Sequence, residues 1–199
     1  MENIKKRLAF MWLFVFAVYL PFFVFMVTRH NVSAISMSVI GWTSGGVRYL
    51  AAYIILTLPF CLYQLFFFNR RFAGNSKFTR VMGIVSCIMI TAGAFVPVHR
   101  HGRLFDFAHI FLSVTGAVML MLTILIALVR YALRKKTHKI AALSLCGIYA
   151  AALLAAFYVL YTAALFQLLS SLSFFLVLLV VNTVLAVTPK TAAPAEPGA

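Results

Sequence analysis

The stretch LAFMWLFVFAVYLPFFVFMVT, from Leu8 to Thr28, contains no charged residue over its 21 positions. An α-helix rises 1.5 Å per residue, so about 20 apolar residues cross the roughly 30 Å of hydrocarbon in a bilayer. The stretch therefore predicts a membrane-spanning helix. It is longer than the apolar region of a signal peptide, about 7–15 residues, and no small-residue cleavage site follows it. We therefore expect a retained membrane anchor.

Five further apolar stretches are long enough to cross the bilayer. The expected spans are residues 8–28, 47–68, 81–98, 107–129, 140–160 and 163–187. The fold class expected is therefore all-α, a polytopic transmembrane bundle of six helices forming one domain over residues 1–188. Residues 189–199 are rich in Ala and Pro and predict a flexible tail.

The composition of the chain excludes the usual soluble classes. Of its 199 residues, 64% are hydrophobic and only 10% are charged, whereas soluble domains are about 45–50% apolar and about 25% charged. The net charge of +14 on so apolar a chain is better explained by membrane topology than by nucleic-acid binding, so no nucleic-acid partner is expected.

The basic residues orient the predicted bundle. Thirteen of the 17 fall on the side that holds both termini, and the other four are Arg29, Arg48, Arg100 and Arg103. Because Lys and Arg accumulate in cytoplasmic loops, we expect both termini in the cytoplasm and the protein in the inner (plasma) membrane. No Asp, Glu or Lys lies deep in a span, which argues against a proton-coupled pump or transporter.

Small and helix-breaking residues within the spans predict how the bundle packs. The Ala-rich stretch 141–156 predicts a central fifth helix, because small residues let backbones approach closely in lipid. Pro21 and Pro59 lie inside the first two spans and are expected to be tolerated there.

The side opposite the basic loops carries the candidate site. Asp106 and His109 are three residues apart at a helix start, so they project from one face. Arginine and histidine donors suit an anionic headgroup. We expect an outer-leaflet pocket that binds the anionic headgroup of a membrane lipid or a lipid-linked ligand, without a cofactor. Its predicted residues are Arg48, Arg103, Asp106, His109, Ser36 and Ser38.

A purely structural interpretation is that Asp106 only caps its helix and pairs with Arg103 or Arg48. A competing hypothesis is a zinc site in a lipid hydrolase or acyltransferase, although the neighbouring arginines would repel a dication. Its ligands would be His99, His101, Asp106 and His109.

The sequence also permits two hypotheses that need neither zinc nor an anion site. A serine of the first outer loop, Ser36 or Ser38, would be a nucleophile with His109 as base and Asp106 as its orienting acid. The chain would otherwise be a non-enzymatic subunit whose apolar faces bind another membrane protein. Residue types alone do not decide whether any reaction is catalysed.

Two segments carry a family resemblance. The stretch ISMSVIG at 35–41 is a serine-rich S-x-x-G loop, and AGAFVP at 92–97 is followed by His109. With the span count, these resemble a bacterial six-span family of unknown function that is related to the Frag, DRAM and Sfk membrane proteins, over roughly residues 8–187. Many relatives have an acidic residue before the loop glycine, whereas this chain has Ser38-Val39.

The resemblance implies a set of signature positions and a class of ligand. The signature positions are Ser36, Ser38, Gly41, Pro97 and His109. Relatives include proteins linked to glycolipid-anchor remodelling and membrane-lipid organisation, which favours lipid as the ligand. The resemblance does not establish catalysis.

Overall fold

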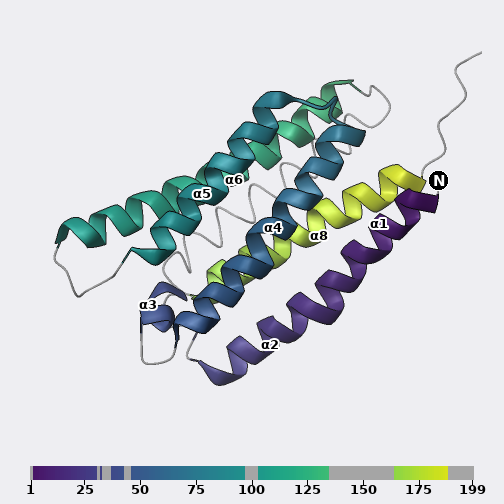
Figure 1. The fold of residues 1–199 in the computed structure, drawn as a ribbon. Coiled ribbons are helices and arrows are strands. Elements are labelled where there is room, and N and C mark those ends of the chain that lie inside the picture. The colour runs from purple at the N-terminus through teal and green to yellow at the C-terminus, as the bar shows by residue number, and fades with distance from the viewer. Residues whose placement is uncertain are drawn as a thin grey trace, which may run out of the picture.

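A computed structural model describes residues 2–30, 32, 37–42, 46–96, 103–134 and 164–187, and its regular structure there is helical throughout (Figure 1). The elements are α1 (Glu2–Leu13), the π-helical η1 (Phe14–Tyr19), α2 (Leu20–Arg29), α3 (Met37–Trp42), α4 (Val47–Arg71), α5 (Lys77–Phe95), α6 (Arg103–Arg134) and α8 (Ala164–Val187). The fifth predicted span and the predicted tail lie outside the described residues. The all-α fold class is confirmed for the described part.

Five helices within the described ranges are long and apolar enough to cross a membrane. They are the continuous helix formed by α1, η1 and α2, then α4, α5, and most of α6 and α8. These are predicted spans one, two, three, four and six, so a multi-pass membrane protein is confirmed. Several helices extend beyond the predicted apolar stretch, to Arg71 in α4 and back to Lys77 in α5. Long basic side chains permit this, because they reach the headgroup region.

Pro21 lies inside the first helix without ending it. In the π-helical segment before it, the Leu20 amide donates to the carbonyl of Val15, five residues back. Pro21 has no amide hydrogen for the usual helical bond, and the wider turn accommodates this loss. Pro59 likewise lies inside α4. The prediction that both prolines are tolerated is confirmed.

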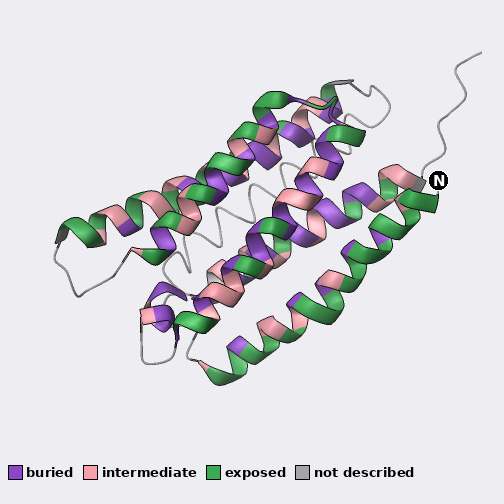
Figure 2. Ribbon diagram, in the orientation of Figure 1, coloured by how far each residue is buried: buried purple, intermediate pink, exposed green. Residues whose placement is uncertain are grey.

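α4 is the most enclosed of the described spans. In the most apolar 18-residue stretch of α4, 50% of the residues are buried. The corresponding share is 22% for the first helix and 33% for α5, α6 and α8. It packs against α3, α5 and α8, and exposed residues gather on the outward faces of α1, α2, α5 and α6 (Figure 2). Exposed apolar side chains such as Phe16, Ile88 and Phe111 suit a lipid surrounding.

α5 and α6 form a closely packed pair (Figure 1). A Cβ atom at Gly93 would lie 2.6 Å from the Ser113 amide nitrogen, and one at Gly116 would lie 2.9 Å from the Ile90 amide nitrogen. Non-bonded heavy atoms pack at about 3.5–4.0 Å, so only glycine fits at these two positions. The two glycines therefore set the distance between the helices.

The turn between α4 and α5 joins three helices at one end of the bundle. The Asn69 side chain donates from Nδ2 to the Ser76 carbonyl at 2.9 Å and accepts from the Ser76 amide at 3.0 Å. Arg130 of α6 donates from Nη1 to Ser76 Oγ at 2.9 Å. Ser76 Oγ also accepts from the Thr79 amide and so caps α5.

Candidate functional site

Arg48 is exposed at the start of α4. Its Nη2 donates to the Tyr49 hydroxyl at 3.1 Å, and its guanidinium carbon lies 4.9 Å from the centre of the Tyr49 ring. The Tyr49 ring also contacts the rings of Phe25 and His30 at the end of α2. Arg48 is thus held at what we call the α3 end of the bundle, where α2 and α5 finish and α4, α6 and α8 begin (Figure 1).

His109 is buried within α6, with 9% of its surface exposed. Its Nδ1 lies 2.7 Å from the carbonyl oxygen of Gly93 in α5. Because a carbonyl can only accept, Nδ1 carries the proton and donates it. This bond joins α5 to α6 at their glycine contact. In the predicted Ser-His-Asp arrangement, Nδ1 would donate to Asp106. Here Nδ1 donates to the Gly93 carbonyl.

The other predicted site residues lie at the start of α6, in α3 or outside the described residues. Asp106 lies in the first turn of α6, where a carboxylate complements the positive end of the helix. Arg48 donates to Tyr49 and His109 donates to Gly93, so these hydrogen bonds run to residues outside the predicted set. Arg103 is the first residue of α6. Ser36, His99 and His101 lie outside the described residues.

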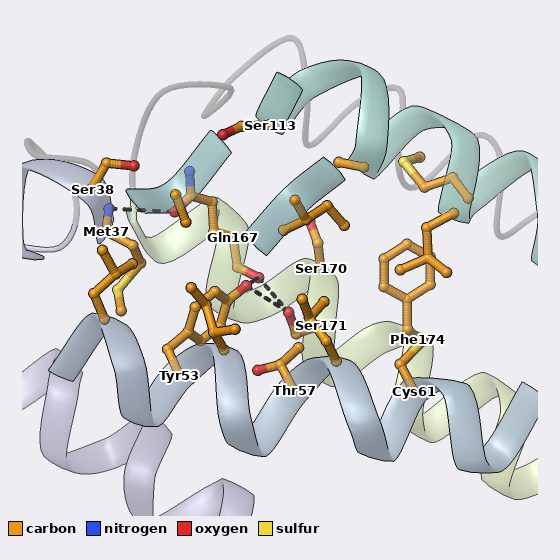
Figure 3. A pocket seen from close by; sticks show the side chains of 18 of the residues that line it. Met37, Ser38, Tyr53, Thr57, Cys61, Ser113, Gln167, Ser170, Ser171 and Phe174 are labelled. Carbon is orange, nitrogen blue, oxygen red and sulfur yellow. Dashed lines mark hydrogen bonds between the residues drawn. The ribbon is translucent and has the colours of Figure 1, made fainter. Parts of the chain in front are cut away.

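Ser38 lines a cavity of about 150 Å³ between the helices (Figure 3). The cavity lies toward the α3 end of the bundle, because its walls come from α3, the end of α5, and residues 50–61 of α4, 113–121 of α6 and 167–175 of α8. Its wall is mostly apolar. The apolar side chains that define it include Leu50, Ile54, Leu58, Ile90, Leu120 and Phe174.

A hydrogen-bonded network lies on the cavity wall between α4 and α8 (Figure 3). The Tyr53 hydroxyl lies 2.8 Å from Ser171 Oγ and 3.1 Å from the Gln167 carbonyl. Ser171 Oγ donates to the same carbonyl at 2.9 Å. The Gln167 side chain accepts from the Met37 amide at 3.3 Å and so attaches α3 to α8. The Tyr53 and Ser171 hydroxyls are therefore both partnered within the protein.

Two further residues of the wall carry hydroxyls, Thr57 and Ser170. The Thr57 hydroxyl lies beside the Tyr19 hydroxyl of η1, whereas Ser170 Oγ has no hydrogen-bond partner among the described residues. Thr57 is only 5% exposed. In a helix such a hydroxyl commonly bonds to a carbonyl of the preceding turn, as Thr123 does with Met119 at 2.7 Å. A buried donor without a partner costs about 1–3 kcal/mol. The Ser170 hydroxyl can therefore bond to a molecule in the cavity.

Except for Ser38, the cavity residues are not identified as a site by the sequence. A signal for them is present in their spacing. Tyr53 and Thr57 are four residues apart on α4, and Gln167 and Ser171 are four apart on α8, so each pair occupies one face of an otherwise apolar span. Hydroxyls and amides at helical spacing are a weaker signal than clustered charges, so the sequence favours the charged cluster instead.

The described residues contain no group of three or more His, Cys, Asp or Glu side chains that could hold a metal ion. Two of the four predicted zinc ligands, His99 and His101, lie outside the described ranges. The zinc-site hypothesis therefore stays a prediction.

No family model matches the chain, and neither the curated proteins nor the solved structures contain a significant match. The resemblance to the six-span family stays a prediction. The proposal for function rests on the cavity and on the residues around it.

Proposed function

We propose that this protein is a six-span protein of the plasma membrane that binds an outer-leaflet lipid or lipid-linked ligand with an anionic headgroup. In this proposal the cavity takes an apolar part of the ligand, and basic side chains at the α3 end bind the headgroup. The observation that carries the proposal is a mostly apolar cavity of about 150 Å³ between helices long enough to cross a bilayer.

The positions at which α6 ends and α8 begins support the six-span count. Near the end of α6, Arg130 bonds to Ser76 in the α4–α5 turn. The start of α8 is at the opposite end, where the Leu165 amide donates to the Val32 carbonyl at 2.8 Å. The predicted span at 140–160 lies between these two ends in the sequence and supplies the sixth crossing of this proposal. Six crossings put both termini on one side, and the distribution of basic residues favours the cytoplasm for that side.

The size of the cavity suits part of a lipid. An apolar cavity of about this volume holds a group the size of a benzene ring, about six carbon atoms. Lipid chains are the most abundant apolar molecules beside the α3-end half of the bundle. Since lipid tails are as apolar as the wall residues Ile54, Leu120 and Phe174, selective binding requires close packing and polar contacts rather than the release of water.

The α3 end supplies cations close to the cavity. Arg48 lies two residues before Leu50, which lines the cavity, so a headgroup just outside the cavity is within reach of this arginine. Arg103 begins α6 at the same end. A guanidinium matches the oxygens of a phosphate with paired hydrogen bonds. The remaining residues of the proposed site are Ser36, Ser38, Asp106 and His109.

Native mass spectrometry with added lipids tests this function. We expect phosphatidylglycerol to bind more tightly than phosphatidylcholine of equal chain length. Arg48→Gln is expected to reduce that preference about three- to tenfold, since it removes a charge-assisted hydrogen bond. Arg71→Gln is the matched control, because Arg71 is an exposed arginine at the other end of α4. Equal binding of the two lipids, or the same loss in both variants, would contradict the proposal.

A further inference from the structure

The end of the bundle opposite the α3 end carries a second cluster of basic residues. We call it the α1 end, because α1 and α5 begin there and α4 and α6 finish there (Figure 1). We propose that this end binds an anionic phospholipid, with the lipid phosphate at Arg80 and Arg130 and an acyl chain along the exposed face of α5. These residues are distinct from those of the site at the α3 end.

Arg80 and Arg130 both approach Ser76 at the start of α5. Arg130 of α6 is half-buried, and its Nη1 donates to Ser76 Oγ at 2.9 Å. The Arg80 amide donates to the Ser76 carbonyl at 3.3 Å, so Arg80 lies one helical turn further along α5. Helical side chains lean toward the start of their helix, which brings the Arg80 side chain back over the turn that begins at Ser76. Two guanidinium groups therefore gather around one serine.

The Arg80 guanidinium is not fully paired within the described part of the protein. Its Nε is buried and has no hydrogen-bond partner among the described residues. A buried donor without a partner is unfavourable, and more so when the group is charged. Arg80 as a whole is only half-buried, so part of the side chain is accessible from outside. A phosphate accepts paired hydrogen bonds from a guanidinium and supplies the opposite charge.

The acidic residues of the described ranges do not neutralise this cluster. They are Glu2 and Asp106, and Asp106 lies at the α3 end. Glu2 is bonded to Lys6 of its own helix at 2.7 Å. Lys77 adds an exposed positive charge three residues before Arg80. The cluster therefore attracts anions, and anionic lipids are abundant in the cytoplasmic leaflet, on which the proposed topology places this end.

The exposed face of α5 favours a lipid over a free phosphate ion. Lys77, Val81, Ile84 and Ile88 follow one another at steps of four, three and four residues, so they lie on one face of the helix. Val81, Ile84 and Ile88 are 57%, 42% and 61% exposed. An acyl chain along this face contacts apolar side chains while its phosphate stays level with Lys77 and Arg80. A free phosphate ion gains nothing from these apolar contacts.

Photolabelling of the full-length protein in phosphatidylcholine nanodiscs tests this inference. The probes are phosphatidylglycerol and phosphatidylcholine that each carry a photoreactive diazirine near the ester end of one acyl chain. Mass spectrometry locates the labelled peptides and gives the half-saturating mole fraction of each probe, with and without an excess of inorganic phosphate. Arg80→Gln removes the charge from the proposed site. Arg71→Gln is the matched control, because Arg71 is an exposed arginine of the same end, on α4.

We expect saturable labelling at the start of α5. The phosphatidylglycerol probe is expected to half-saturate at a mole fraction about tenfold lower than the phosphatidylcholine probe, the effect of one hydrogen bond to a charged group. Arg80→Gln is expected to remove most of this preference, and Arg71→Gln and inorganic phosphate to leave it unchanged. If Arg80→Gln disturbs folding, Lys77→Gln, a change at an exposed position, is expected to reduce the same preference about threefold.

Several outcomes would overturn the inference. They are labelling at the start of α5 that does not saturate, equal half-saturation by the two probes, an equal loss in Arg71→Gln, or displacement of the lipid probe by inorganic phosphate, which identifies a site for the free ion. The labelled peptides separate this site from the one at the α3 end. A missing preference at the start of α5 refutes this inference alone, whereas the Arg48→Gln experiment tests the proposed function.

Discussion

Replacing Ala94 with leucine tests whether the cavity is a ligand site. Ala94 is buried near the end of α5 and lines the cavity. Leucine adds three carbon atoms, where a cavity of this size holds about six. We therefore expect Ala94→Leu to fill about half of the cavity and to exclude the group that a ligand inserts there.

The expected effect on stability follows from the volume of the cavity. An empty cavity lowers the free energy of unfolding by about 24 cal/mol per Å³, so 150 Å³ corresponds to about 3.6 kcal/mol. Filling half of it recovers about 1.8 kcal/mol, and strain from an imperfect fit offsets part of this gain. The ligand-free Ala94→Leu protein is therefore expected to be about 1 kcal/mol more stable than the wild type.

Titration with SDS measures the free energy of unfolding, and native mass spectrometry measures lipid binding by the same preparation. Ala92→Leu is the matched control, because Ala92 is exposed on the same helix. We expect lipid binding to weaken at least tenfold in Ala94→Leu and to remain unchanged in Ala92→Leu. A folded Ala94→Leu protein that binds lipid like the wild type would refute the reasoning, and so would a loss of stability of about 2 kcal/mol or more.

Three further predictions concern the fold. Gly93→Ala is expected to lower the free energy of unfolding by about 2 kcal/mol, because the new Cβ meets the Ser113 backbone. As the control for this variant, Gly83→Ala meets only the ends of leucine side chains and is expected to change the free energy of unfolding by less than about 1 kcal/mol. Asn69→Ala removes two hydrogen bonds from the Ser76 backbone, whose carbonyl still accepts from the Arg80 amide. We expect a loss of about 2 kcal/mol in the same SDS titration, and unchanged stability would argue against this role of the turn. In a bacterial host, a C-terminal green fluorescent protein is expected to fluoresce and a C-terminal alkaline phosphatase to be inactive, whereas an active phosphatase would place the C-terminus outside.

The positions of the described spans could be predicted from the sequence because span length and apolarity are local properties. α4 begins at the predicted Val47, and α8 begins one residue from its predicted start. The contact between α5 and α6 could not be predicted, since Gly93 and Gly116 lie in different spans and small residues do not reveal which helix they face. Hydropathy also contains no information on the π-helical bonding before Pro21.

The candidate site was less predictable because it depends on which helices are neighbours. The sequence shows that His109 is near Asp106, but only the packing of α5 on α6 shows that its Nδ1 bonds to the Gly93 carbonyl. In the same way, Tyr53 resembles any other tyrosine in a span until the fold places its hydroxyl 2.8 Å from Ser171 Oγ on the cavity wall.

An experimental structure of the protein in nanodiscs that contain phosphatidylglycerol tests the central claim most directly. We expect non-protein density in the cavity, in contact with its lining residues on α4 and α8 and continuing toward Arg48 at the α3 end. Lipid density confined to the outward faces of the helices, with the cavity empty or filled by the protein's own side chains, would contradict the claim that this cavity is a lipid-binding site.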